Sequence, residues 1–162
     1  VRAARPDVGF HVVGMNPAPA VRALARLPGV HVVGRVPDMR PWLQHARVVV
    51  APLRVARGIQ NKVLEAMSMG RPVVTTSQCA AAIRARPGTA LAVADGEDAL
   101  AREVLRLLAP DAGNAMGAAA RQAVLAHHAW GPSAARIVDL LGDGAAASGD
   151  APVPRPRERM AG

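Results

Sequence analysis

The sequence predicts an α/β fold in which a parallel, Rossmann-like sheet is covered by helices on both faces. Between residues 8 and 93, short runs rich in Val alternate with stretches long enough for crossover helices, and the chain then becomes purely helical. Nearly continuous β-branched runs are typical of strands buried on both faces. Regular alternation of strand and helix is typical of parallel sheets, and right-handed crossovers leave few topologies open.

Each element of this fold is assigned from its own run of residues. The expected strands are Val8–Gly14, Gly29–Gly34, Arg47–Leu53, Arg71–Thr76 and Ala90–Val93. The helices expected between them are Ala18–Leu27, Asp38–Ala46, Asn61–Met69 and Cys79–Arg86. Three more helices are expected at the C-terminal end, where Pro110 and Gly131–Pro132 separate the segments. Their apolar faces are Leu100, Val104, Leu107 and Leu108, then Met116, Ala120, Ala123 and Val124, then Ile137, Leu140 and Leu141.

Composition limits the classes of function open to the chain. Its 162 residues carry 20 Lys+Arg against 12 Asp+Glu, a formal charge of +8, and the length suits one domain with a real core. All the basic residues except Lys62 are arginines, and they are scattered along the whole chain. Nucleic-acid binding would need basic residues on one face and aromatic rings for stacking, whereas the only aromatics are Phe10, Trp42 and Trp130. We therefore expect no nucleic-acid partner.

The single cysteine fits a reducing compartment, and the hydropathy pattern shows no transmembrane segment. Cys79 excludes a disulfide scaffold and is interpreted as structural. No apolar run approaches the roughly 20 residues of a transmembrane helix, so a cytoplasmic protein is expected.

His127–His128 has no Cys, Asp or Glu at ligand spacing, so no metal is expected. We predict a domain over residues 1–142 and a disordered tail over residues 143–162, which lack apolar periodicity.

Candidate site residues lie where ligands bind in open α/β sheets, beyond the carboxyl ends of the strands. Four segments meet this condition: Gly14–Pro17, Gly34–Pro37, Pro52–Lys62 and Thr75–Ala80. The first two follow a repeated motif, His-Val-Val-Gly, which occurs at residues 11–14 and 31–34. Each terminal Gly marks either a tight strand-to-helix turn or a close approach of the backbone to another group.

The third segment combines a basic loop with the expected start of a helix. Asn61 is a good N-cap residue, and the free amides of the first turn, with the helix dipole, favour an anion. Arg54 and Arg57 bring positive charge to the same place. Lys62 is unfavourable at a helix N-terminus unless an anion is bound there. Glu65 lies on the same helical face and could accept from a ribose diol, so the segment fits a nucleotide.

A second interpretation of the same residues stays open. Glu65 is favourable near a helix start for dipole reasons alone, and Lys62 and Glu65 could form a solvated ion pair worth a few tenths of a kcal/mol. Other chemistry has no support, because the chain lacks a Walker A motif, a complete G-x-G-x-x-G and a G-x-S-x-G elbow.

Residues Pro52–Arg54, Gly58–Met67 and Gly70–Val74 resemble the donor-binding segment of retaining GT-B glycosyltransferases. More narrowly, they resemble sugar transferases of bacterial exopolysaccharide and exosortase (PEP-CTERM) systems. Gly34–Asp38 and Val93–Asp95 match in order and spacing, and the likeness covers roughly residues 6–142. It implies that the chain is the C-terminal half of a GT-B fold.

The resemblance also implies roles for individual residues. The ligand would be a nucleotide-diphosphate sugar, with Glu65 on its ribose and no metal or other cofactor. The residues expected to bind the donor are Arg54, Arg57, Gly58, Ile59, Gln60, Asn61, Lys62 and Glu65. The expected nucleobase loop is Gly34, Arg35 and Val36, and the expected glycine loop is Gly14, Met15 and Asn16. No residue of this chain is assigned as catalytic.

Two departures from the family pattern shape these expectations. Many relatives carry a Glu eight residues before the one that matches Glu65, whereas this chain has Arg57 there, which implies altered sugar recognition. The acceptor domain, the first strand of this domain and a basic loop are expected upstream of Val1. The chain alone is therefore expected to bind a nucleotide weakly and to show no turnover. The acceptor would be a glycan or lipid-linked, and a lipid-linked acceptor would place the protein peripherally at the inner face of the membrane.

Two alternatives belong to other classes of function. A GT-B sugar-nucleotide epimerase shares this architecture but needs acid and base carboxylates from both domains, and no such pair is evident here. A truncated, non-catalytic nucleotide-binding remnant is the second alternative.

Overall fold

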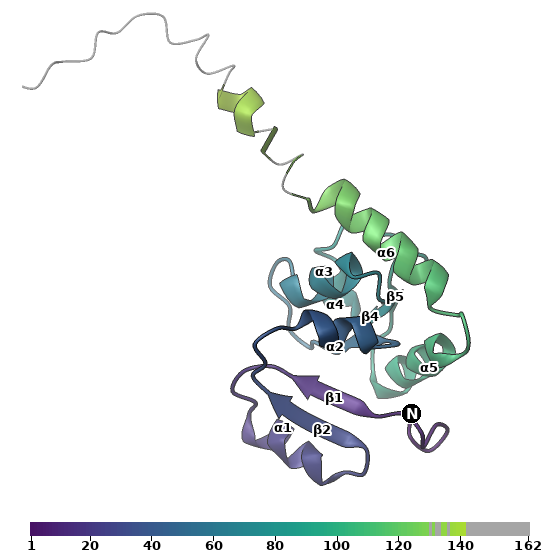
Figure 1. The fold of residues 1–162 in the computed structure, drawn as a ribbon. Coiled ribbons are helices and arrows are strands. Elements are labelled where there is room, and N and C mark those ends of the chain that lie inside the picture. The colour runs from purple at the N-terminus through teal and green to yellow at the C-terminus, as the bar shows by residue number, and fades with distance from the viewer. Residues whose placement is uncertain (130, 132–133, 136, 142–162) are drawn as a thin grey trace, which may run out of the picture. The chain divides into compact units, whose positions relative to one another are not determined.

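The computed structural model describes residues 1–129, 131, 134–135 and 137–141 of the chain. It contains two compact units, Val1–His128 and a unit that begins at Ala129. All the strands found among the described residues lie in the first unit (Figure 1). Residues 137–141 of the second unit are helical, and Ile137, Leu140 and Leu141 are exposed. The tail expected over residues 143–162 and Trp130 lie outside the described residues.

The five strands of the first unit all lie within the runs expected from the sequence, but they form two parallel sheets rather than one. The two-stranded sheet pairs β1 with β2, and the three-stranded sheet has the order β3–β4–β5. The α/β prediction with parallel pairing is thus confirmed. The strand bounds are β1 Phe10–Val13, β2 Val30–Gly34, β3 Val49–Ala51, β4 Val73–Thr75 and β5 Ala92–Val93.

Helices connect the strands and close the unit (Figure 1). Their bounds are α1 Pro19–Ala23, the 3₁₀ helix η1 Leu24–Arg26, α2 Arg40–His45, α3 Asn61–Ser68, α4 Ser77–Ala80, α5 Glu97–Leu108 and α6 Asn114–His127. None of those in the described part of the chain is long and apolar enough to cross a bilayer.

Strand β4 lies at the centre of the core. Successive side chains of a strand point to opposite faces, and Val73 and Val74 accordingly belong to two different apolar clusters. Val73 packs in the cluster of α3 with Val63 and Met67, and Val74 packs in the cluster of α5 with Leu107. Covered on both faces, β4 is fully buried, as the sequence predicts for this run.

Helix α6 approaches the turn before β4 closely enough to require glycine. A Cβ built on Gly117 would lie 2.1 Å from the carbonyl oxygen of Gly70, and one on Gly113 would lie 2.8 Å from Cγ of Pro72. Both contacts are below the distance that real Cβ atoms keep. Small residues therefore allow α6 to pack against α3 and close the core.

Strands β1 and β2 differ from the prediction of burial on both faces. Phe10 is 43% exposed, His11 and His31 are exposed, and the other β1 residues are half-buried. The imidazole rings of His11 and His31, which pair in register, stack with centroids 4.7 Å apart. The expectation of two-sided burial was wrong here because, among the described residues, neither apolar cluster includes a residue of β1 or β2.

The expected helix Cys79–Arg86 is also corrected. Helix α4 spans Ser77–Ala80, so Cys79 lies inside it and is buried. The chain then leaves the helix in tight turns, with the Ile83 amide donating to the Ala80 carbonyl at 2.9 Å, and Ile83 enters the core at 6% exposure.

Candidate functional site

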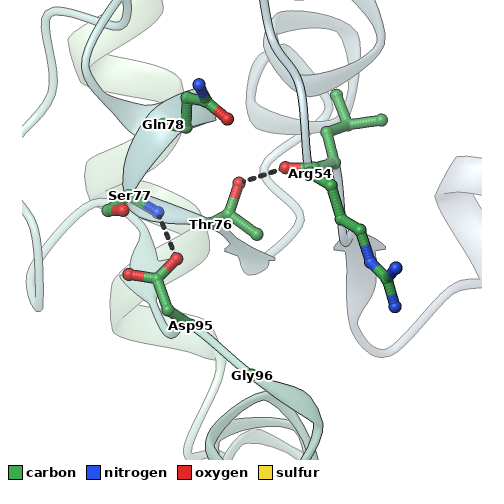
Figure 2. Close-up of a pocket in the computed structure, with 7 residues that line it drawn as sticks. Arg54, Thr76, Ser77, Gln78, Asp95 and Gly96 are labelled. Carbon is green, nitrogen blue, oxygen red and sulfur yellow. Dashed lines mark hydrogen bonds between the residues drawn. The ribbon is translucent and has the colours of Figure 1, made fainter.

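The carboxyl ends of β3, β4 and β5 surround an open cavity of about 570 Å³ (Figure 2). Each strand contributes residues that lie shortly after its end, as expected for a parallel sheet. Its volume is within the range of roughly 300–1,000 Å³ that is typical of ligand pockets. The lining residues are Leu53, Arg54, Thr76, Ser77, Gln78, Asp95 and Gly96.

Side-chain hydrogen bonds hold these three strand ends together. The Thr76 hydroxyl donates to the Leu53 carbonyl at 2.7 Å, which ties the end of β4 to the end of β3. The Ser77 amide donates to Oδ1 of Asp95 at 3.0 Å, which ties the start of α4 to the segment after β5 (Figure 2). The buried Thr75 hydroxyl donates to the Ala51 carbonyl at 3.0 Å, which is a second side-chain bond between β4 and β3. The cavity thus has a preformed wall.

The basic loop between β3 and α3 leads directly into the start of that helix. Gly58 takes φ +66°, a conformation that favours glycine. The N-cap is Gln60 rather than Asn61, so that expectation was wrong. The Gln60 side chain does not cap the helix, since its amide donates back to the carbonyls of Arg57 at 3.3 Å and Gly58 at 3.4 Å. The first-turn amides at Asn61 and Lys62 therefore have no capping side chain from Gln60.

Lys62 and Glu65 are both exposed on α3 and form no ion pair with each other. The first turn of α3 also has no acidic residue that could offset the lysine charge. The interpretation of these two residues as a solvated pair therefore has no support in the geometry. A cation at the positive end of a helix dipole is left without an anionic neighbour on that turn.

A second cavity, of about 510 Å³, lies beside β2 and is lined by residues of both loops that begin at Gly14 and Gly34. Its lining residues are Asn16, Pro17, Arg22, Ala25, Val32, Val33, Gly34 and Arg35. The Gly14 amide donates to the Gly34 carbonyl at 2.9 Å, so the two loops are joined. Gly34 takes φ +79° with nothing within 4 Å of a built Cβ, which favours the tight-turn interpretation over a close approach within the chain.

An ion pair closes the loop that follows Gly34. Oδ1 of Asp38 accepts from the Arg40 backbone amide at 2.9 Å, and the Arg40 guanidinium lies 3.0 Å from the carboxylate. The side-chain hydrogen bond from Arg40 lowers the pKa of Asp38 below its ordinary value. Arg40 is engaged by Asp38, whereas Arg35 forms no ion pair within the described part of the chain and lines the second cavity.

The structure brings the expected site residues together in separate groups. Arg54 lines the first cavity, and Asn16, Gly34 and Arg35 line the second. Seven of the expected donor-binding residues line neither cavity and form the exposed loop and first turns of α3: Arg57, Gly58, Ile59, Gln60, Asn61, Lys62 and Glu65. Val36, Gly14 and Met15 also lie outside both linings.

Sequence reasoning passed over Asp95 as a lining residue of the first cavity. The signal was available, because Asp95 comes shortly after β5 and the carboxyl-end rule applies to that strand as well. No cluster of three or more His, Cys, Asp or Glu that could hold a metal ion occurs among the residues that the structure describes.

Residues 1–110, more than two thirds of the chain, match the model of the family described as glycosyl transferases group 1. The chain belongs to this family. The GT-B resemblance inferred from the donor-binding segment is thereby confirmed. No curated protein matches this glycosyltransferase chain significantly in sequence.

Solved structures support the fold of this group 1 glycosyltransferase chain. A sucrose-phosphate synthase from Thermosynechococcus elongatus aligns with a TM-score of 0.74 and 22% identity over 90% of this chain and 41% of its own. HepE from Anabaena, in complex with UDP, aligns with a TM-score of 0.62 and 18% identity over 74% of this chain and 37% of its own. A structure of HepE with UDP and glucose aligns with a TM-score of 0.63 and 16% identity over 76% of this chain and 37% of its own. The chain thus spans less than half the length of these proteins.

Proposed function

We propose that this chain is the donor-binding part of a retaining glycosyltransferase that moves a sugar from a nucleotide-diphosphate sugar to a glycan or lipid-linked acceptor. The observation that carries the proposal is the start of α3. There Lys62 lies at the positive end of a helix whose first turn has no acid, directly after a loop that carries Arg54 and Arg57. Arg57, Lys62 and the uncapped amides suit a diphosphate.

In this proposal the charge that develops on the departing diphosphate is stabilised by these fixed cations and dipoles. Preorganised donors act strongly at such a position because they need no rearrangement during the reaction. The residues of this chain therefore require no metal ion for that role. Glu65, one turn along the same face and free of Lys62, accepts from the ribose hydroxyls.

The cavity beside β2 is proposed to border the nucleobase. Its rim includes Gly34 and Arg35, and the tie between Gly14 and Gly34 keeps the two loops in place. HepE, whose fold this chain shares, forms a complex with UDP and another with UDP and glucose. This supports a nucleotide sugar as the ligand here. We propose a cytoplasmic enzyme of bacterial exopolysaccharide synthesis, held peripherally at the membrane when its acceptor is lipid-linked.

Calorimetric titration of the chain with UDP, GDP and ADP tests the proposal. One nucleotide is expected to bind saturably, and Glu65→Gln should weaken it by about 1–3 kcal/mol, the scale of a lost hydrogen bond to a charged group. Glu97→Gln is the matched control, because Glu97 occupies the first turn of a different helix, α5. Absence of saturable binding, or equal losses in the two variants, would overturn the proposal.

Lys62→Ala gives a second, independent readout of the diphosphate contact. The variant should bind the same nucleotide more weakly, and its affinity should depend less on salt, because one screened charge–charge interaction is gone. Titrations at low and high ionic strength measure this dependence. A slope equal to that of the unaltered chain would show that Lys62 does not contact the phosphates.

A further inference from the structure

The first 47 residues have a charge distribution different from that of the residues that follow. They carry seven Arg and two Asp, whereas residues 48–129 carry nine basic and six acidic residues. Both aspartates are paired with arginine, Asp7 with Arg5 at 2.7 Å and Asp38 with Arg40 at 3.0 Å. Between these pairs, residues 8–37 contain no acidic residue. This acid-free stretch includes β1, α1, η1 and β2, so the charged side chains on these elements are all cations.

Two arginines of the acid-free stretch lie on α1 and η1. Arg22 and Arg26 are exposed and form no ion pair within the described part of the chain. Nε of Arg22 donates to the Pro17 carbonyl at 2.8 Å, which holds the side chain without neutralising its charge. Exposed cations that no carboxylate offsets attract a negatively charged surface.

Large apolar side chains are exposed beside these cations. Leu24 begins η1 and is 37% exposed, and Leu27 follows η1 and is 53% exposed. Backbone hydrogen bonds bring Phe10 of β1 close to them, since the Phe10 amide donates to the Gly29 carbonyl at 2.8 Å and the Leu27 amide donates to the Leu24 carbonyl at 2.9 Å. A single exposed leucine is ordinary, but several neighbouring apolar groups mark an interaction site.

The alternation of side chains along β1 places Phe10 on the same side of the β1–β2 pair as η1. The ring of His11 lies 5.7 Å from that of Trp42 of α2, so Phe10 points to the face opposite that of His11. Val32 is in register with the residue two positions after Phe10 and therefore points the same way. Val32 and Ala25 of η1 line the same cavity, so η1 lies on this side.

We propose that Phe10, Arg22, Leu24, Arg26 and Leu27, here called the basic apolar face, dock on a membrane surface that contains anionic lipids. The apolar side chains enter the headgroup boundary while the arginines attract lipid phosphates, as in interfacial helices. A lipid surface carries charge of one sign, which matches a stretch without any acid, whereas protein surfaces mix both signs. The inference goes beyond the proposed function, in which only a lipid-linked acceptor holds the protein at the membrane.

Vesicle flotation of the 162-residue chain tests this inference in the absence of nucleotide and acceptor. Vesicles of phosphatidylcholine alone are compared with vesicles that contain equal parts of phosphatidylcholine and phosphatidylglycerol. The chain should bind the anionic vesicles at least about tenfold more tightly, and high salt should weaken this binding because it screens the arginines. Equal binding to the two kinds of vesicle, or none to either, overturns the inference.

A charge variant locates the contact on the basic apolar face. Arg26→Gln should weaken binding to anionic vesicles about fivefold, the scale for one arginine near such a surface. Arg102→Gln is the matched control, because Arg102 on α5 is also exposed and forms no ion pair within the described residues. It should change the binding by less than about twofold. Equal losses in the two variants would show attraction by net charge alone and overturn the face.

An apolar variant tests insertion separately from charge. Leu27→Ala should weaken binding to the same vesicles about three- to tenfold, since part of a leucine side chain no longer leaves water. Leu125→Ala on α6 is the control, because Leu125 is 52% exposed and lies outside the acid-free stretch. It should leave the binding unchanged. No difference between the two leucine variants overturns the insertion of this face.

Nucleotide titrations of the same proteins separate this inference from the proposed function. Arg26 and Leu27 line neither cavity, so their variants should bind nucleotide as the unaltered chain does. Nucleotide binding without a preference for anionic vesicles overturns the membrane face and leaves the proposed function standing. Binding to anionic vesicles that depends on Arg26 and Leu27, without binding of any nucleotide, supports the face and contradicts the proposed function.

Discussion

The two parallel sheets of this chain are built from similar runs of Val but differ in burial. Val73, Val74 and Thr75 of β4 are fully buried, whereas β1 leaves Phe10 43% exposed. The difference comes from the helices. Residues of α3 and α5 pack on the two faces of β4, and α6 packs against α3. An apolar run therefore predicts a strand, while its burial depends on helices that lie far away in sequence.

The largest effect on the free energy of unfolding is expected from a comparison of two leucines. Leu91→Ala removes a fully buried side chain beside β5 and should lower the free energy of unfolding by about 2–5 kcal/mol through lost burial and a cavity. Leu27→Ala, next to η1 and 53% exposed, should change it by less than about 0.5 kcal/mol. Urea unfolding measures both. Comparable losses would contradict a core confined to the three-stranded sheet.

The same substitution at two glycines sharpens the comparison. Gly117→Ala places a Cβ against the backbone oxygen of Gly70, which cannot rotate away, and should cost about 1–3 kcal/mol. Gly14→Ala, at the end of β1, has nothing within 4 Å of the new Cβ and should have a much smaller effect. Thermal unfolding of the two variants is the measurement. Equal midpoints would show that α6 packs less closely on the turn at Gly70.

These contrasts show what the sequence could and could not predict. The strands, their parallel pairing and the α/β class follow from local patterns of β-branched residues, and every observed strand lies inside its expected run. The division into two sheets depends on contacts between distant segments, which one sequence does not contain. The short α4 was missed for the same reason, because Ile83 leaves the helical path to reach the core.

The candidate site was predictable to a similar extent. The rule for carboxyl ends located Arg54, Gly34, Arg35 and Asn16, which the structure places on two cavities. The rule did not identify Gln60, rather than Asn61, as the N-cap of α3, because the boundaries of helices shift by a residue or two with local hydrogen bonding. The role of Asp95 depends on the Ser77 amide, a contact across 18 residues.

A smaller effect is the pH dependence of the free energy of unfolding, which we expect from His128 at the end of α6. Nε2 of His128 accepts the Arg84 backbone amide at 3.1 Å, which requires an unprotonated ring nitrogen. Burial, with smaller contributions from the charges of His127 and Arg84, lowers the pKa of His128. The folded state therefore binds fewer protons. The stabilising contribution is complete above the unfolded-state pKa of about 6.5 and is lost as pH falls below it toward the lower folded value.

Unfolding free energies measured between pH 7.5 and 5 test this contribution. The unaltered chain should lose stability on the acid side, and His128→Gln, which cannot take up a proton, should show a flatter profile over the same interval. An identical pH dependence in the two proteins would show that His128 does not couple protonation to folding.

The most direct test of the central claim, that a nucleotide binds at the strand ends while the packed core stays unchanged, is hydrogen–deuterium exchange with and without the nucleotide that binds. Without ligand, amides of β4 should exchange most slowly and those of β1 faster. With ligand, protection should rise at residues 34–36 and 58–62 and stay constant in α5 and α6. Protection confined to α5 and α6, or no change at residues 58–62 under saturating nucleotide, would contradict the account.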